Sequence, residues 1–122
     1  MIDHITIHVA DLDASTAFYT RALAPLGYAL LLKGEQFAGF GAGGKHDFTL
    51  AVGTPIAPVH VAFRAQGRAD VRAFYEAAVS AGGADNGPPG VRADYHPDYY
   101  GAFVRDPDGH NVEAVCHAAY LG

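Results

Sequence analysis

The hydrophobic pattern of the chain changes its period several times. Residues 2–9 alternate between apolar and polar side chains, which predicts a strand with one buried face. Residues 12–26 then repeat apolar side chains at helical spacing, until Pro25 and Gly27 stop the helix. Three more strands are predicted over 28–33, 36–41 and 48–52, with glycine-containing turns between them. The first half of the chain therefore has the element order βαβββ.

The second half repeats this order. A strand is predicted over 59–65 and a helix over 69–81, followed by a flexible Gly/Pro loop at 87–90 and a hairpin that closes over 103–115. His60, Phe74-Tyr75 and Gly83 follow His4, Phe18-Tyr19 and Gly27 at a constant offset of 56 residues. Further along the sequence, residues His110 to Glu113 align with His46 to Thr49 at an offset of 64. The pattern predicts two βαβββ modules, at about 1–54 and 57–118, in a single domain over 1–122 with a shared core.

Three side chains with metal-binding chemistry occupy related positions in the two modules. His4 and His60 lie in the first strand of each module, and Glu113 lies in the last strand of the second. Each lies on the opposite face of its strand from the apolar side chains, so we expect all three to project from the face that the helices leave open. Two imidazoles and a carboxylate that converge make a divalent-metal site with open positions. The alternative is a hydrogen-bonded histidine in each strand and a solvated glutamate.

Further polar residues are candidates for contacts with a substrate. Thr6, His8 and Arg64 share the parity of the histidines on their strands. The segment 95–100 holds three tyrosines, a histidine and an aspartate, and could form a pocket wall or lid. In this segment His96 is the candidate for proton transfer, and Tyr99 and Tyr100 are candidate substrate contacts. The alternative is that these tyrosines are half-buried strand or interface residues and that His96 belongs to a turn.

Composition narrows the class of partner. The net charge is −5 and only eight lysines and arginines are scattered along 122 residues, so we expect neither nucleic acid nor a membrane surface as a partner. The longest apolar run, about 28–32, is far shorter than a membrane span. The single cysteine, Cys116, fits a reducing compartment and is expected to be buried. These features favour a cytoplasmic protein.

The motifs resemble those of the vicinal oxygen chelate superfamily, which includes glyoxalase I, bleomycin-resistance proteins, fosfomycin-resistance transferases and extradiol dioxygenases. The residues that carry the resemblance are Asp3-His4-Ile5-Thr6, Asp11-Leu12, Phe18-Tyr19, Leu26-Gly27, Val59-His60-Val61 and Asp106-Pro107-Asp108-Gly109-His110 with Glu113. The resemblance implies an α+β glyoxalase-like fold, in which the paired modules form a curved, open mixed or antiparallel sheet. It also implies a homodimer and a metal held at His4, His60 and Glu113.

Two positions depart from the patterns of named members. Thr49 stands where glyoxalase I has a fourth metal ligand, and Phe103 stands where the dioxygenases and fosfomycin enzymes have a tyrosine. Tyr99 or Tyr100 could replace that phenol.

Two functions follow from the sequence. The first is a metal-dependent lyase, isomerase or dioxygenase, in which Fe, Mn, Ni or Zn is chelated by a small oxygenated substrate and Glu113 or His96 moves the proton. The alternative is a metal-free protein of the bleomycin-resistance type, which binds a drug or aromatic ligand between tyrosine-lined walls.

Overall fold

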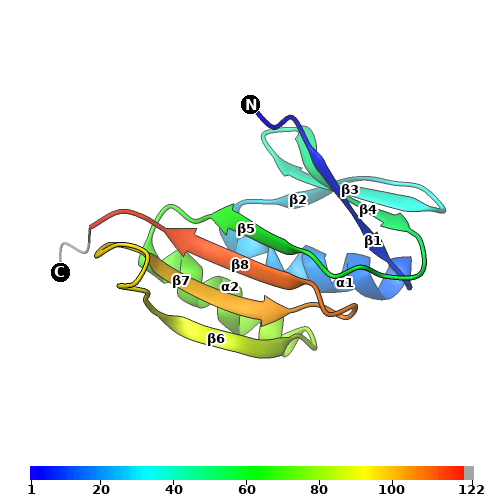
Figure 1. The fold of residues 1–122 in the computed structure, drawn as a ribbon. Helices are drawn as coiled ribbons and strands as arrows, with labels where there is room; N and C mark the ends of the chain where they lie inside the picture. The colour runs from blue at the N-terminus through cyan, green and yellow to red at the C-terminus, as the bar shows by residue number, and fades with distance from the viewer. Residues whose placement is uncertain (120–122) are drawn as a thin grey trace.

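A computed structural model describes residues 1–119; the last three residues of the expected domain, 120–122, lie outside the described part. The chain forms two four-stranded mixed sheets, each joined to one long helix (Figure 1). The first module consists of β1 (Ile5–Val9), α1 (Leu12–Ala22), the short 3-10 helix η1 (Ala24–Leu26), β2 (Ala29–Lys33), β3 (Phe37–Ala42) and β4 (Lys45–Val52). The second consists of β5 (His60–Arg64), α2 (Arg68–Ser80), β6 (Ala84–Val91), β7 (Tyr100–Arg105) and β8 (Asn111–Cys116). This is the α+β arrangement of two βαβββ modules that the sequence predicts.

The two sheets have the same strand order. In the first sheet the order is β1-β4-β3-β2, and in the second it is β5-β8-β7-β6. The first and last strands of each module run parallel, and all other pairs are antiparallel. Thr6 pairs with Thr49 in one sheet, and Ala62 pairs with Glu113 in the other. These are the partners that the offsets of 56 and 64 residues require, so the repeat read from the sequence is a repeat in space.

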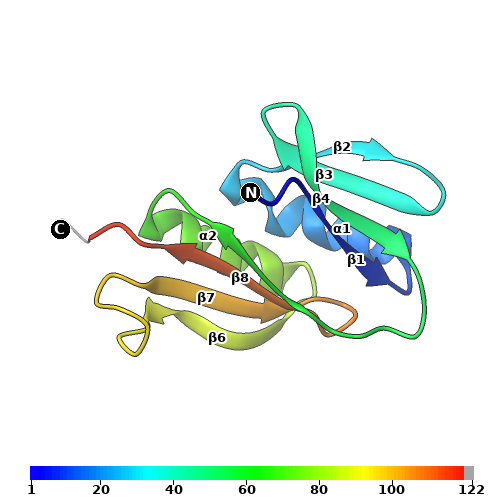
Figure 2. The same ribbon diagram turned by 45° about the horizontal axis from the view of Figure 1, so that its top comes forward.

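Both helices cover one face of the sheets and leave the other face open. Figure 1 shows α2 behind the sheet of β5 to β8, with no helix in front of that sheet, and Figure 2 shows α1 and α2 side by side between the modules. The helix-facing side chains of both modules form one continuous buried cluster. Phe48 of β4 meets Phe63 of β5 edge to face, with ring centroids 5.1 Å apart. The modules therefore share a core, and Cys116 belongs to it at 1% exposure.

The β7–β8 turn ties the second module to the first. The buried carboxylate of Asp106 accepts hydrogen bonds from the Tyr19 hydroxyl of α1 and from the backbone of its own turn at Asp108 and His110. Asp108 reaches the same module, accepting from Ala10 N and from the Ser15 hydroxyl. Gly109, at a φ of 86°, supplies the left-handed residue that this turn needs.

The buried imidazole of His110 completes the same connection. Its Nδ1 accepts from Val59 N at 3.0 Å, so the proton must be on Nε2, which donates to the His8 carbonyl at 2.8 Å. Val59 directly precedes His60, and the turn therefore fixes where β5 begins. We define Asp106, Asp108 and His110 as the module clamp.

Two elements differ from the sequence prediction. The helix predicted over 12–26 ends at Ala22, and the separate 3-10 helix η1 covers Ala24–Leu26. The Gly/Pro stretch at 87–90, predicted to be a flexible loop, lies inside β6. Its pairing with β7 is interrupted by register shifts between Asp85 and Gly87 and between Gly87 and Gly90. β6 is an edge strand, and prolines are tolerated at edges and bulges because no ladder hydrogen bond is lost there. Among the described residues, no helix is long and apolar enough to cross a membrane.

Candidate functional site

The open face of the second sheet holds a histidine–carboxylate pair. His60 Nε2 lies 2.7 Å from Glu113 Oε1, with the two residues on neighbouring parallel strands. Glu113 is 1% exposed, whereas the His60 side chain is 54% exposed. A buried carboxylate needs partners because desolvation of an unpaired charge costs several kcal/mol. His60 supplies one of these partners, on the solvent side.

The second partner is the phenol of Tyr99. Its hydroxyl donates to Glu113 Oε2, so both oxygens of the carboxylate are occupied. Burial and this hydrogen bond raise the pKa of Tyr99, which therefore remains a neutral donor. Gly101 makes the arrangement possible, since a Cβ at this position would lie 3.3 Å from Glu113 Oε2 and 3.3 Å from the Tyr99 ring. Tyr99 thus meets the carboxylate that the sequence analysis selected.

His96 lies one step further from the carboxylate. Its Nδ1 accepts from Asp98 N at 3.1 Å, which places the ring proton on Nε2, and Nε2 lies 2.8 Å from His117 Nδ1. The rings of His96 and His117 both contact the Tyr99 ring edge to face, at 5.4 and 5.2 Å. The His96 ring therefore packs against Tyr99, which in turn binds Glu113. His117 belongs to the same cluster, and the sequence analysis did not select it.

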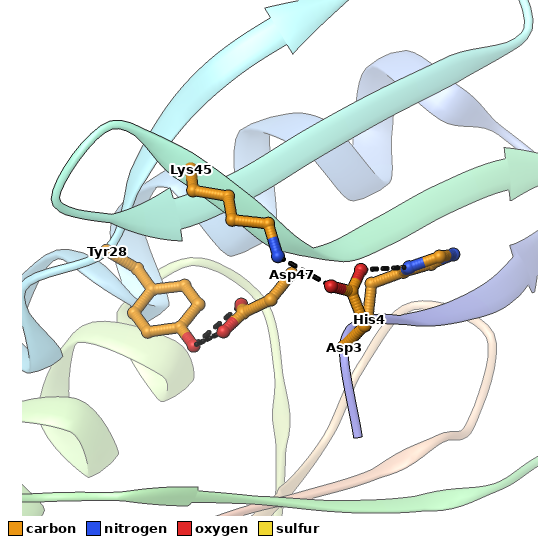
Figure 3. Close-up of polar contacts among 5 residues, drawn as sticks. All are labelled: Asp3, His4, Tyr28, Lys45 and Asp47. Carbon is orange, nitrogen blue, oxygen red and sulfur yellow. Dashed lines mark hydrogen bonds and ion pairs between the residues drawn. The ribbon is translucent and has the colours of Figure 1, made fainter. Parts of the chain in front are cut away.

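His4, the third expected ligand, lies on the first module. Figure 3 shows its ring beside Asp3, with His4 Nδ1 2.8 Å from Asp3 Oδ1 and Lys45 Nζ 2.7 Å from Asp3 Oδ2. The hydrogen bond from Lys45, and then that from His4, lowers the pKa of Asp3 to about 2. His4 and His60 line the same cleft, of about 460 Å³, at the start of β1 and along β5. Within residues 1–119, however, His4 does not join His60 and Glu113 in a group whose ligand atoms all lie within 4.8 Å of one another.

The remaining predicted residues divide between the faces of the sheets. Thr6 and His8 alternate with buried Ile7 and Val9 on β1 and are exposed, but neither lines the cleft. Arg64 does line it. Tyr100 pairs with Cys116 on the helix side of β7, where its ring lies 4.8 Å from the Arg68 guanidinium of α2. Tyr100 therefore faces away from Glu113, and the prediction that it lies beside Tyr99 at the carboxylate is wrong.

The module clamp is the one group of three acidic or histidine ligands within 4.8 Å that the described residues contain. Its ligand atoms are already engaged. Both Asp106 oxygens and both Asp108 oxygens accept protein hydrogen bonds, and both His110 nitrogens are used. A cation there would have to displace bonds that hold the modules together. We therefore assign the clamp a structural role.

Sequence reasoning also missed a polar pair at the cleft. The Tyr28 hydroxyl lies 2.8 and 3.0 Å from the two oxygens of Asp47, and both residues line the cleft (Figure 3). Tyr28 precedes β2, and its place at the start of the apolar run 28–32 gave no sign of a polar cross-strand partner. Asp47 has the parity of Thr49 on β4, and that parity was the available signal.

Comparisons with known proteins agree on the fold. The model of the glyoxalase/bleomycin resistance protein/dioxygenase superfamily matches residues 1–114. A glyoxalase/bleomycin resistance protein from Albidiferax ferrireducens is 27% identical, with a TM-score of 0.82 over 95% of this chain and 98% of that one. A lactoylglutathione lyase from Agrobacterium tumefaciens is 20% identical, with a TM-score of 0.71 over 95% and 92%. No curated protein matches the sequence.

The family match extends through β5 and into β8, and so includes His4, His60 and Glu113. The clamp turn Asp106 to His110 lies within it as well. The chain belongs to the glyoxalase/bleomycin resistance protein/dioxygenase superfamily.

Proposed function

We propose that this chain is a metal-dependent enzyme that acts on a small oxygenated substrate. The observation that carries the proposal is the contact between His60 Nε2 and Glu113 Oε1, a nitrogen and a carboxylate oxygen side by side on an open sheet face. This donor set fits Fe, Mn, Ni or Zn, which accept imidazole and carboxylate ligands. His4 is the third ligand of the proposed set.

The proposed set requires more than one chain as it is folded here. His4 pairs with Asp3 and does not converge with His60 and Glu113 within one chain. We therefore propose a homodimer in which each site combines His60 and Glu113 of one chain with His4 of the other. The exposed leucines of edge strand β2, at 37–39% exposure for residues 30–32, offer apolar surface for such an association.

A bound divalent ion would polarise a substrate oxygen and stabilise negative charge as it develops. The residues of the chain supply the proton chemistry. Glu113 accepts a proton at Oε1 or Oε2 once a substrate has taken the place of one of its donors. Tyr99 holds a proton at its hydroxyl beside Oε2, and the rings of His96 and His117, whose nitrogens lie 2.8 Å apart, pack against the Tyr99 ring. These groups make isomerase, lyase or oxygenase chemistry at adjacent oxygens the proposed reaction class.

A second candidate is a metal-free binding protein, as the bleomycin-resistance branch implies. The observation that favours it is that both Glu113 oxygens already have donors from His60 and Tyr99. Such a pair is self-sufficient and needs no cation.

Equilibrium dialysis separates the two functions. The wild-type chain, stripped with a chelator, is dialysed against Fe²⁺, Mn²⁺, Ni²⁺ and Zn²⁺ in turn. The enzyme proposal expects one tightly held ion per chain with at least one of these metals. If none of the four metals binds wild type more tightly than it binds His60→Ala, the metal-free function is supported.

A further inference from the structure

A cleft lies between the two modules of one chain, beside the His60–Glu113 pair. It is lined by the start of β1, by Tyr28, by Asp47 and Phe48 of β4 and by the whole of β5. Its volume of about 460 Å³ is in the range of small-molecule sites. Glu113 does not line it. The cleft therefore does not include the carboxylate of the proposed metal site, although His4 and His60 both line it.

Asp47 brings a carboxylate into this cleft with no cation to balance it. Within residues 1–119 no lysine, arginine or histidine nitrogen lies within 4.0 Å of Asp47. Lys45, the nearest lysine or arginine in sequence, is instead bound to Asp3, as Figure 3 shows. The partner of Asp47 is the neutral phenol of Tyr28, whose hydroxyl contacts both carboxylate oxygens. A half-buried carboxylate with one phenol donor keeps acceptor capacity for a charged donor.

Arg64 brings the opposite charge to the same cleft. Its guanidinium makes no ion pair within the described residues. Asp47 and Arg64 therefore line one space with opposite charges and form no ion pair with each other. A ligand that bridges them must itself carry both charges.

Apolar side chains line the same cleft as the charged groups. Ile5 and Val61, both half-buried, line the cleft together with the edges of Phe48 and Phe63. These walls suit a hydrocarbon or aromatic segment, which gains free energy when it leaves water.

We propose that this cleft binds a small zwitterion, an amino-carboxylate with an apolar side chain. The ammonium group donates to Asp47 beside Tyr28, the carboxylate accepts from Arg64, and the apolar part lies against Ile5 and Val61. This site goes beyond the proposed metal chemistry and does not depend on it, because none of its charged contacts is a proposed metal ligand.

Three matched probes test the proposal. The chelator-treated 122-residue chain is titrated with L-phenylalanine, phenethylamine and 3-phenylpropionate, and amide chemical shifts are followed by NMR. The three compounds share a benzyl group and differ in charge. The proposal expects L-phenylalanine to bind at least about tenfold more tightly than either single-charge probe, since each charge-assisted contact contributes to affinity. The shifts should centre on Tyr28, Asp47 and Arg64.

Two variants test which side chain binds which charged group of the ligand. Asp47→Asn keeps an acceptor for Tyr28 and should weaken phenylalanine and phenethylamine, while leaving phenylpropionate unchanged. Arg64→Gln should weaken phenylalanine and phenylpropionate, while leaving phenethylamine unchanged. Arg105→Gln, an exposed arginine outside the cleft, is the matched control and should change nothing.

Three results would overturn the proposal. These are equal binding of all three probes, no binding at millimolar concentrations, or shifts that lie away from the cleft. Because the titration contains no metal, the two proposals can fail separately. If wild type binds metal no more tightly than His60→Ala but still binds phenylalanine, the metal centre is refuted and the zwitterion site stands.

Discussion

The hydroxyl of Tyr99 reaches the Glu113 carboxylate, which Phe103, the cross-strand neighbour of Glu113, cannot hydrogen-bond. The resemblance to dioxygenases and fosfomycin enzymes leads one to expect a tyrosine at position 103. Here the phenol comes instead from the loop before β7 and approaches over Gly101. The chain therefore retains a phenolic donor at the carboxylate by a different route.

Removing this phenol should destabilise the fold. Tyr99→Phe leaves one oxygen of a buried carboxylate without its donor, for an expected loss of about 1–3 kcal/mol in the free energy of unfolding. Urea titration measures the loss. Tyr100→Phe is the matched control, because its hydroxyl contacts the exposed Arg72 side chain at 3.3 Å and should cost less. Equal losses for the two variants would show that the contact with Glu113 stabilises the fold no more than the contact of Tyr100 with Arg72.

The module clamp predicts a second stability effect. His110→Ala removes the ring that joins Val59 N to the His8 carbonyl, and we expect a loss of about 1–3 kcal/mol in the free energy of unfolding. His8→Ala is the control, since it keeps the carbonyl that His110 uses and should change stability little. The reverse order of the two losses would contradict the assigned role.

Alkaline pH should weaken the contact between Tyr28 and Asp47. Burial, and then the hydrogen bond to Asp47, raises the pKa of Tyr28 from 10.0 to about 12. The folded state therefore holds this proton more tightly than the unfolded state, so the stabilisation is complete below pH 10 and is lost as the pH rises towards 12. Tyrosinate absorbance of wild type minus Tyr28→Phe should show one group that titrates near 12. A difference curve with its midpoint at the ordinary tyrosine value would refute this.

Mixing subunits tests the proposed homodimer. His4→Ala and Glu113→Gln chains should each bind the ion weakly alone, whereas a mixture unfolded and refolded together should regain a fraction of tight sites. In a mixed dimer one site has His60 and Glu113 from one chain and His4 from the other, all intact. If the mixture binds no better than its components, the site is not shared between chains.

Much of the fold is predictable from the sequence, because alternation and repeats report burial directly. The parity of His60 and Glu113 placed them on one face, and their adjacent strands then brought them within 2.7 Å. The Gly/Pro stretch at 87–90 was misread because local turn chemistry favours a loop, while pairing with β7 makes it a bulged edge strand.

The relation between the modules is less predictable. His4 and His60 are equivalent in the repeat, but equivalence says nothing about how the two open faces are oriented to each other. That orientation depends on the clamp, whose bonds link residues as far apart as Tyr19 and Asp106. Tyr100 shows a related limit, since the start of β7 decided which of two adjacent tyrosines met Glu113.

The central claim is that His60 and Glu113 hold a divalent ion. The most direct test is metal content and affinity, measured by elemental analysis and chelator competition, for wild type, His60→Ala, Glu113→Gln and Asp108→Asn. Asp108→Asn serves as the control, because Asp108 belongs to the module clamp, the other group of acidic and histidine side chains. The claim predicts one ion per chain in wild type and Asp108→Asn, and loss of tight binding in both other variants. An ion retained in His60→Ala and Glu113→Gln but lost in Asp108→Asn would contradict it and move the metal to the clamp.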